Sequence, residues 1–395
     1  MAKRIALIFI LFLLGDIYFY QAFSTLISSA ALRYIYWALD LLLILSIVAL
    51  LSFPRLRKNT AKYFPTFISA MLLFFVPKLV SVPFLLLEDV GRAFNGFPAR
   101  NLYVSELVVA LAIILFGLIV FGLTRGRHHY KVRKTTIYFP DLPKSFDGFS
   151  ITQLSDIHAG SLKNKREVQR GVNLANAQGS DLLLFTGDLV NNAASEVTAW
   201  MSTFAQLDAP YGKYAILGNH DYGDYMAWEN SMAKRRNLDQ LKQNHSAMGF
   251  RLLLNESVTL RKDGESIRLI GVENWGKGGF QRYGDLAKAT ANVPHQSFNI
   301  LMSHDPSHWD EVVRQHQQPI QLTLSGHTHG MQFGFEIRRF KWSPIQYFYK
   351  QWAGLYQKGQ QYLYVNRGFG FHGLKGRIGM WPEITVLVLK RTESA

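Results

Sequence analysis

The sequence predicts an α/β domain preceded by an all-α membrane region of about four helices. Residues 1–134 carry long apolar runs, whereas residues 135–395 mix charges, turns and short apolar strands as a soluble domain does. Several of those strands end directly in an aspartate, asparagine or histidine. Because a chain of this length has room for roughly two or three domains, we divide it into a membrane region, residues 1–130, and a soluble domain, residues 131–395.

Four apolar stretches come close to the roughly 20 residues that cross a bilayer. They are residues 5–27, 34–53, 64–87 and 102–123. The first stretch also resembles a signal peptide, but its apolar run exceeds the usual core of about 7–15 residues, and three more candidates follow it. Prolines interrupt the third stretch, which predicts a kinked span, with a re-entrant segment as the alternative.

The net charge of +15 raises the question of nucleic-acid binding. Residues 1–134 hold 15 Lys and Arg against 5 Asp and Glu, so two thirds of the excess flanks the apolar stretches. A nucleic-acid-binding domain would concentrate that charge on its soluble part. We therefore expect the lipid bilayer as a partner and no nucleic acid.

The positive charges also predict an orientation. They gather at the N-terminus, on the second loop (for example Arg55, Arg57 and Lys58) and after the fourth stretch. Because such residues favour the cytoplasmic side, both termini are predicted there. The chain is expected to be a multi-pass protein of the cytoplasmic or inner membrane with its soluble domain in the cytoplasm. Its oligomeric state is not indicated.

Ionisable residues occur within or at the ends of the apolar stretches: Asp16, Asp40, Lys78 and Glu106. Such residues are functional candidates by default, and pairing between helices or snorkelling to the interface is the alternative we favour. The chain has no cysteine, which excludes disulfides, thiol nucleophiles and cysteine-ligated metal sites.

Five apolar strands of the soluble domain end in potential metal ligands. These ligands are Asp156, His158, Asp188, Asn219, His304, His327 and His329. In α/β sheets, ligands collect beyond the carboxyl ends of the strands, so these side chains are expected to converge on one site. A set of carboxylate, amide and imidazole groups suits Mn, Fe or Zn.

In their order along the chain these blocks resemble the calcineurin-like metallophosphoesterases over about residues 135–390. The matching blocks are Asp156-x-His158, Gly187-Asp188, Gly218-Asn219-His220-Asp221, His304 and Gly326-His327-x-His329. The resemblance implies a four-layer α/β/β/α sandwich that holds two divalent metal ions. By motif, the first ion would bind Asp156, His158 and His329. The second would bind Asn219, His304 and His327, and Asp188 would bridge the two.

The resemblance also implies a mechanism in which a hydroxide bridging both metals attacks phosphorus. His220 would protonate the leaving oxygen and Asp221 would orient His220; a surface histidine in a turn is the alternative. One departure concerns the residues after Gly187-Asp188, where many members carry another acidic residue and this chain has Asn191 and Asn192. Support for the site on that side is therefore open.

Two further segments are candidates for substrate contact. The Gly-rich turn before the last strand resembles the closing loop of the family, so Asn366 and Arg367 are expected to bind substrate. The histidines outside the ligand blocks are treated as surface or packing residues, with His372 in this turn as the best exception. Residues 333–356 are rich in aromatic and basic residues, which suits a membrane headgroup region; a loop covering the core is the alternative.

The overall plan resembles transmembrane metallophosphoesterases and, more distantly, UDP-2,3-diacylglucosamine pyrophosphatase-like enzymes. We expect a membrane-anchored phosphohydrolase that cleaves a phosphoester or pyrophosphate bond, with a lipid or lipid-linked substrate. An anchored phosphodiesterase or phosphatase acting on soluble substrates is the second hypothesis. A non-catalytic membrane scaffold is the third, and the complete ligand set argues against it.

Overall fold

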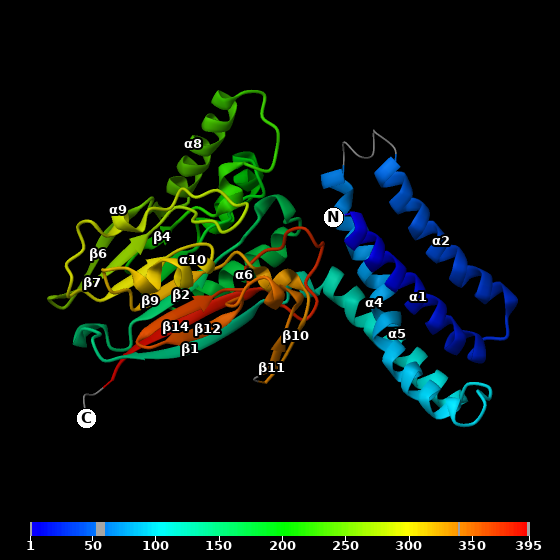
Figure 1. Ribbon diagram of the computed structural model, residues 1–395. Helices are drawn as coiled ribbons and strands as arrows, with labels where there is room; N and C mark the ends of the chain where they lie inside the picture. Colours follow the sequence, from blue (N-terminus) through cyan, green and yellow to red (C-terminus); the bar gives the residue numbers. More distant parts are fainter. Residues whose placement is uncertain (1, 53–59, 339, 393–395) are drawn as a thin grey trace. The chain divides into compact units, whose positions relative to one another are not determined.

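The computed structural model describes residues 2–52, 60–338 and 340–392 (Figure 1). The chain forms two compact units, one of residues 1–125 with 373–376 and one of residues 126–372 with 377–395. Arg55, Arg57 and Lys58, which contributed to the predicted orientation, lie outside the described residues.

The first unit contains four helices within the described residues, as the sequence predicted. They are α1 (Ala2–Leu26), α2 (Ala30–Ser52), α4 (Thr60–Ala93) and α5 (Leu102–Thr124). Side chains from all four meet in one apolar cluster, which includes Phe19, Tyr36, Leu85 and Val108. Two described helical stretches, Pro65–Ala93 and Leu102–Thr124, are long and apolar enough to cross a membrane, and the apolar part of α1, Ile10–Leu26, is shorter.

Helix α4 runs without a break through Pro65, Pro77 and Pro83. Ser81 lies one turn after Pro77, and its hydroxyl donates to the Pro77 carbonyl at 2.9 Å and to the Val108 carbonyl of α5 at 3.3 Å. A serine can thus bond the backbone near a proline and tie the helix to its neighbour. The structure has a continuous helix here, not the re-entrant alternative.

The ionisable residues of the helices pair with one another. Lys78 Nζ lies 2.6 Å from Asp16 Oδ1 and 3.0 Å from Asp40 Oδ1, so three helices meet at this cluster. The Tyr36 hydroxyl donates to the Asp16 carboxylate. Glu106 is exposed. The favoured alternative, pairing between helices, is therefore found for Asp16, Asp40 and Lys78, and it offsets the cost of placing charges among apolar helices.

The second unit is built on two mixed six-stranded sheets. The first has the order β1-β14-β2-β3-β4-β5. Its strands are β1 (Lys131–Phe139), β14 (Glu383–Arg391), β2 (Ser150–Leu154), β3 (Leu182–Phe185), β4 (Lys213–Ala215) and β5 (Arg251–Leu252). Strands β2 to β5 are parallel, and β14 pairs with β2 in the antiparallel sense.

The second sheet has the order β12-β13-β9-β8-β7-β6. Its strands are β12 (Gly354–Lys358), β13 (Gln361–Val365), β9 (Leu322–Ser325), β8 (Asn299–Met302), β7 (Glu265–Gly271) and β6 (Glu256–Lys262). Strands β7, β8, β9 and β13 are parallel. A separate hairpin of β10 (Phe335–Ile337) and β11 (Phe340–Trp342) lies outside both sheets.

Alternating strand residues divide the core into layers. In β3, Leu182 and Leu184 face the second sheet in the central core, whereas Leu183 and Phe185 pack against helices on the other side. Helices α6 (Lys165–Asn176), α7 (Met201–Phe204) and α8 (Ser231–Ala247) cover the first sheet. Helices α9 (Leu286–Thr290) and α10 (Ser307–Glu311) cover the second. The predicted α/β/β/α sandwich is confirmed, and its parallel strands point their carboxyl ends toward a common edge.

Candidate metal centre

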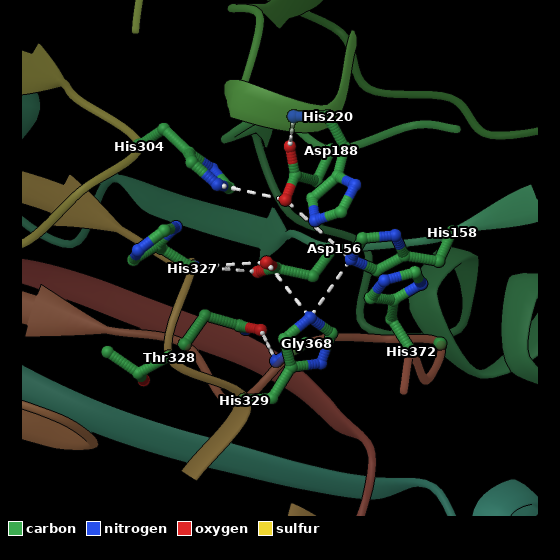
Figure 2. Close-up of polar contacts among 12 residues, drawn as sticks. Asp156, His158, Asp188, His220, His304, His327, Thr328, His329, Gly368 and His372 are labelled. Atoms are coloured by element: carbon green, nitrogen blue, oxygen red, sulfur yellow. Dashed lines mark hydrogen bonds and ion pairs between the residues drawn. The ribbon is translucent and has the colours of Figure 1, made fainter. Parts of the chain in front are cut away.

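The polar residues after five strands converge at that edge. Asp156 and His158 follow β2, Asp188 follows β3, and Asn219 follows β4. His304 follows β8 in the second sheet, and His327 and His329 follow β9. Figure 2 shows the aspartates and the imidazole rings turned toward one another from the two sheets.

The backbone of this edge is strained where the side chains leave the strands. Five non-glycine residues there have φ between 48° and 71°: Asp156, His158, Asp188, His327 and His329. Left-handed conformations of such residues cost on the order of 1–3 kcal/mol each, and they persist where the surroundings impose them. The fold thus holds these side chains in directions that an ordinary turn would not give.

Glycines allow the strand ends to approach one another. A Cβ atom on Gly218 would lie 2.2 Å from Asp188 Oδ1, and one on Gly326 would lie 2.2 Å from Asp156 Oδ2. Both distances are far below van der Waals contact, so any other residue would push the carboxylates away. Gly218 and Gly326, each directly before a ligand block, are needed for this close approach.

Two clusters of donor atoms result, each able to hold a metal ion. In the first cluster, His329 Nε2 lies 3.3 Å from Asp156 Oδ1 and 3.0 Å from His158 Nε2. The backbone N–H of His327 donates to the Asp156 carboxylate at 3.0 Å, which positions that carboxylate.

The second cluster consists of Asp188, His304 and His327. His304 Nε2 lies 3.1 Å from Asp188 Oδ2, and His327 Nδ1 lies 2.8 Å from the Asn219 side-chain oxygen. Asn219 therefore joins this cluster. Asp188 Oδ2 is also 3.6 Å from His158 Nε2, so this carboxylate reaches both clusters.

Burial has the largest influence on the titration of these groups. It raises the pKa of Asp156 to about 6 and lowers the pKa of His158 and of His329 well below the usual value. Burial opposes the charged forms of Asp188 and His304 as well. Their mutual attraction outweighs it, which holds the pKa of Asp188 well below its usual range and raises the pKa of His304 to about 10.

These side chains fit divalent cations. His158 and His329 are kept neutral, which is the form that binds metals, and their Nε2 atoms face each other across 3.0 Å. His304 Nε2 is buried, and it lies 3.1 Å from the Asp188 carboxylate that the second cluster shares. Imidazole nitrogens gathered around carboxylates in this way suit two divalent cations.

His220 lies beside both clusters. Its backbone N–H donates to Asp188 Oδ1 at 2.9 Å, and its Nδ1 lies 2.8 Å from the backbone carbonyl of Asn191. A carbonyl only accepts, so Nδ1 carries a proton in this contact, and His220 lines the cavity over the clusters. His220 is thus oriented by Asn191.

Asp221 was expected to orient His220, and the structure gives it a different contact set. Its carboxylate accepts the backbone N–H groups of Asp188 at 2.9 Å, Leu189 at 2.8 Å and Gly218 at 3.0 Å. It therefore joins the turn after β3 to the turn after β4 and positions Asp188 through the backbone.

Asn366 and Arg367 were expected to contact substrate, and both are buried. The Asn366 side-chain amide donates to the Thr385 hydroxyl at 2.8 Å, and Arg367 Nη1 donates to Glu383 at 2.5 Å. Their polar groups are turned into the core, so they support the Gly-rich turn and do not reach the cavity.

Four residues outside the predicted ligand set contact the clusters. Asn191 Oδ1 lies 3.0 Å from His158 Nδ1 and 3.1 Å from His372 Nδ1, and the ring of His372 stacks on that of His158. The Tyr349 hydroxyl lies 2.8 Å from His327 Nε2, and Arg377 Nη2 lies 3.0 Å from His329 Nδ1. The departure at Asn191 and the histidine in a Gly-rich turn were signals in the sequence. Tyr349 belongs to the aromatic segment 333–356, which was noted without this contact, and Arg377 offered no signal.

A cavity of about 500 Å³ opens over both clusters. His158, Asp188, Asn219, His220, His327, His329 and His372 line its polar side. Apolar side chains form another wall, namely Phe280, Met331, Ile345 and Phe348 with the ring of Tyr349. The site therefore offers cation-binding groups beside a surface that suits a hydrocarbon or aromatic group.

Comparison with protein families gives two matches along the chain. Residues 3–127 match the model described as probable calcineurin-like phosphoesterase, transmembrane domain. Residues 149–331 match the model described as calcineurin-like phosphoesterase. The two matches correspond to the helical unit and to most of the α/β unit.

Curated relatives carry the same description. The chain is 32% identical over 271 residues to the uncharacterized metallophosphoesterase YkuE of Bacillus subtilis, which covers 67% of this chain and 87% of that protein. It is 30% identical to a transmembrane protein with metallophosphoesterase domain of Danio rerio, over 72% of this chain and 63% of that protein. Among solved structures, TT1561 of Thermus thermophilus matches 59% of this chain and 91% of that chain, with 14% identity and a TM-score of 0.35.

Proposed function

The chain belongs to the calcineurin-like metallophosphoesterases with an N-terminal transmembrane region, and we propose that it hydrolyses a phosphoester or pyrophosphate bond of a lipid or lipid-linked substrate. The observation that carries this proposal is the cavity, in which two metal-binding clusters adjoin an apolar wall. A phosphate bearing an apolar group would satisfy both sides at once.

The proposed ligands of the first metal are Asp156, His158 and His329. Those of the second are Asn219, His304 and His327, with Asp188 shared between them. Two Mn, Fe or Zn ions bound there would supply positive charge for the phosphate and activate a water molecule. The two aspartates offset only part of that charge, which leaves the site attractive to an anion.

His220 is the proposed proton donor to the leaving oxygen. The hydrogen bond from its Nδ1 to the Asn191 carbonyl keeps one proton on Nδ1, so the imidazolium form would carry its second proton on Nε2 and give that proton to the leaving oxygen. The His220 side chain lines the cavity that would hold the substrate. Asp221 then contributes through the position of Asp188 and not through the imidazole of His220.

The apolar wall favours a lipid-linked substrate over a soluble one. Phe348 illustrates this, because its ring lines the cavity and is 75% exposed. A soluble phosphodiester or phosphomonoester would leave such surface in water, whereas an acyl or prenyl chain would cover it at about 25 cal/mol per Å². Hydrolysis of soluble substrates by an anchored enzyme remains the second hypothesis.

We also propose that the catalytic unit lies in the cytoplasm. The support is the positive charge at the N-terminus and after the fourth helix. A single cysteine introduced at exposed Met232 tests this, since the natural chain has none. An impermeant maleimide should label it only after the membrane is opened.

The chemistry is tested with purified protein loaded with Mn²⁺ and a soluble phosphodiester. His220→Ala should lower kcat by about 10²–10⁴-fold, the usual contribution of a general acid. Metal content should stay the same, and His295→Ala, at an exposed histidine, should change neither quantity. Full turnover in His220→Ala would remove that residue from the mechanism. Wild-type protein that binds two metals yet cleaves no diester, monoester or pyrophosphate would overturn the proposed activity.

The substrate class is tested by a matched pair of variants. Phe348→Ala should lower kcat/KM on a lipid-linked phosphoester more than on a soluble one. Tyr347→Ala is the control, because Tyr347 is equally exposed, at 73%, but does not line the cavity. Equal losses on both substrates for Phe348→Ala would favour the soluble hypothesis.

A further inference from the structure

The hairpin β10–β11 has an apolar outer face. Phe335 is opposite Trp342, and Ile337 is opposite Phe340, so these four side chains share one side of the two strands. We call this group the hairpin face. The rings of Phe335 and Trp342 stack at 5.6 Å, and Phe335, Ile337 and Phe340 are 41%, 66% and 63% exposed. Contiguous exposed apolar side chains of this kind mark interaction sites.

The opposite side of the hairpin is polar and faces the protein. Glu336 and Lys341 are paired across the strands. The Glu336 carboxylate bonds to Arg133 at 2.6 Å and to Arg367 at 3.1 Å. Lys341 donates to the Ala353 carbonyl and to the Tyr356 hydroxyl.

A hairpin in water is expected to turn its polar side chains outward and its apolar side chains toward the protein. This hairpin has the opposite arrangement. A shift of register by one residue would turn the apolar side chains inward. The ion pairs of Glu336 and the bonds of Lys341 instead hold them outward. The outward apolar face is therefore specified by the structure, and it does not result from an excess of apolar residues in a loop.

Part of the aromatic segment that follows the hairpin is packed. Ile345, Trp352 and Ala353 form a buried cluster with Met380, so this part covers the core. The base of the hairpin is held by Gly334, whose N–H donates to the Ile378 carbonyl at 3.0 Å. A Cβ on Gly334 would lie 2.2 Å from the Trp342 carbonyl oxygen, so this close approach requires glycine. The two alternatives for residues 333–356 thus apply to different parts of the segment.

The hairpin is bonded to a strand that closely follows the last apolar helix in the sequence. Arg133, which binds Glu336, lies in β1 only nine residues after the end of α5 at Thr124. Nine residues span at most about 30 Å even when fully extended. The hairpin therefore contacts the strand that leaves the membrane region.

The charges around the hairpin also suit a membrane surface. Its one acidic residue, Glu336, is neutralised by two arginines. Arg338 at the turn and Lys350 in the following loop are exposed and positive. Aromatic and aliphatic side chains flanked by cations match the boundary between acyl chains and anionic headgroups.

From these observations we propose that the hairpin face of Phe335, Ile337, Phe340 and Trp342 docks into the surface of an anionic lipid bilayer. The hairpin leads through residues 344–347 to Phe348 and Tyr349 in the wall of the metal cavity. Docking would therefore bring the cavity mouth to the lipid surface. The proposal concerns binding and does not depend on the chemistry of the site.

The test uses the full-length protein, in which Ile337→Cys or Phe340→Cys gives a single cysteine for an environment-sensitive fluorophore. The labelled protein is reconstituted in vesicles of phosphatidylcholine and phosphatidylglycerol. The emission should shift to shorter wavelength, and lipids spin-labelled near the headgroup should quench most of it. The control is Met232→Cys on α8, a site 55% exposed, where the emission should stay as in water.

Removing one cation next to the hairpin face should weaken docking. Arg338→Ser should lower the ratio of inserted to free hairpin roughly fivefold, the effect expected for one cation at an anionic surface. Emission as in water at both hairpin positions would overturn the proposal. So would a shift to shorter wavelength that spin-labelled lipids do not quench and that disappears when the protein is diluted in the vesicles, because a second copy of the chain would then cover the face. Neither result bears on phosphoester hydrolysis, which is measured separately.

Discussion

The two halves of the metal centre are the first and the second cluster. They differ in the groups that contact the outer ring nitrogen of each histidine, the one not assigned to the metal. In the second cluster, His304 Nδ1 lies 2.7 Å from the Thr186 carbonyl, and His327 Nε2 lies 2.8 Å from the Tyr349 hydroxyl. Both partners are neutral. In the first cluster, His158 contacts the Asn191 amide and His329 contacts the Arg377 guanidinium. The partner of His329 therefore carries a permanent positive charge.

This difference predicts unequal metal affinity. Arg377 can only donate, so His329 Nδ1 must accept, and the proton of the neutral ring then lies on Nε2. That proton can be given to His158 Nε2, 3.0 Å away. A cation in the first cluster must displace this proton beside a buried guanidinium. We therefore expect the first cluster to bind its metal less tightly than the second.

The carboxylate shared by both halves should matter most. Asp188→Asn keeps the shape but removes the charge that faces His304 and His158. We expect kcat/KM to fall by at least about 10²–10³-fold, the loss typical of a preorganised charged group, together with bound metal. Asp208→Asn, at an exposed aspartate, is the control for kinetics and for metal content by mass spectrometry. A variant that keeps both metals would show that Asp188 does not bridge the halves.

Asn191 tests the first cluster, because its side chain contacts His158. Asn191→Ala removes the acceptor of His158 and should weaken the weaker class of metal site by about 10–100-fold, as loss of a ligand-orienting group does. Asn191→Asp should preserve or strengthen binding, since a carboxylate accepts the same bond. Calorimetric titration of metal-free protein with Mn²⁺ measures both. Weakening of the tighter class by Asn191→Ala would reverse the proposed order.

Tyr349 tests the second cluster, because its hydroxyl contacts His327. Tyr349→Phe removes one hydroxyl from His327 Nε2 and leaves the ring in the cavity wall. The tighter class of site should lose about tenfold in affinity, the lower end of the range for such contacts. The same titration reports it, with Tyr347→Phe as the matched exposed control. If only the weaker class changes, His327 does not belong to the tighter site.

His245 on α8 is a buried histidine outside the metal centre. Its ring nitrogens bond to no described residue, in contrast to those of the cluster histidines. Burial lowers its pKa to about 4. Because the unfolded chain titrates near 6.5, the stability from the neutral ring is complete above that pH and is lost as the pH falls toward 4. At pH 5.5 the loss is about 1 kcal/mol.

His245→Leu should therefore lose about 1 kcal/mol less free energy of unfolding between pH 7.5 and 5.5 than the wild type. Denaturant titrations in detergent, followed by tryptophan fluorescence, give the difference. His295→Leu, at an exposed histidine, should behave as the wild type does. An identical pH dependence in His245→Leu would mean that the buried ring does not control acid stability.

Much of the fold was predictable because it depends on local patterns. The apolar helices and the short strands each follow from periodicity or from apolar runs that end at turns. Asp156, Asp188 and His304 were identified because each directly follows a buried strand, and strand ends of a parallel sheet meet at one edge. The continuation of α4 through three prolines did not follow from local patterns, since it depends on neighbouring helices.

The contacts of the residues around the metal ligands could not be predicted from local patterns. Asp221 is next to His220 in sequence, yet its carboxylate bonds to backbone N–H groups around Asp188. Asn366 and Arg367 lie in the expected turn, but their side chains face the core. A residue's place in a motif limits where its backbone lies and not which way its side chain turns.

The sequence alone therefore determined the class of fold, the candidate ligands and the membrane helices, because these depend on residue type and short-range spacing. Only the tertiary structure decided which groups hold the imidazole rings and which side of the β10–β11 hairpin faces outward. Those features depend on contacts between residues far apart in the chain, such as His329 with Arg377 and Glu336 with Arg133. Packing selects such partners, and no local pattern encodes them.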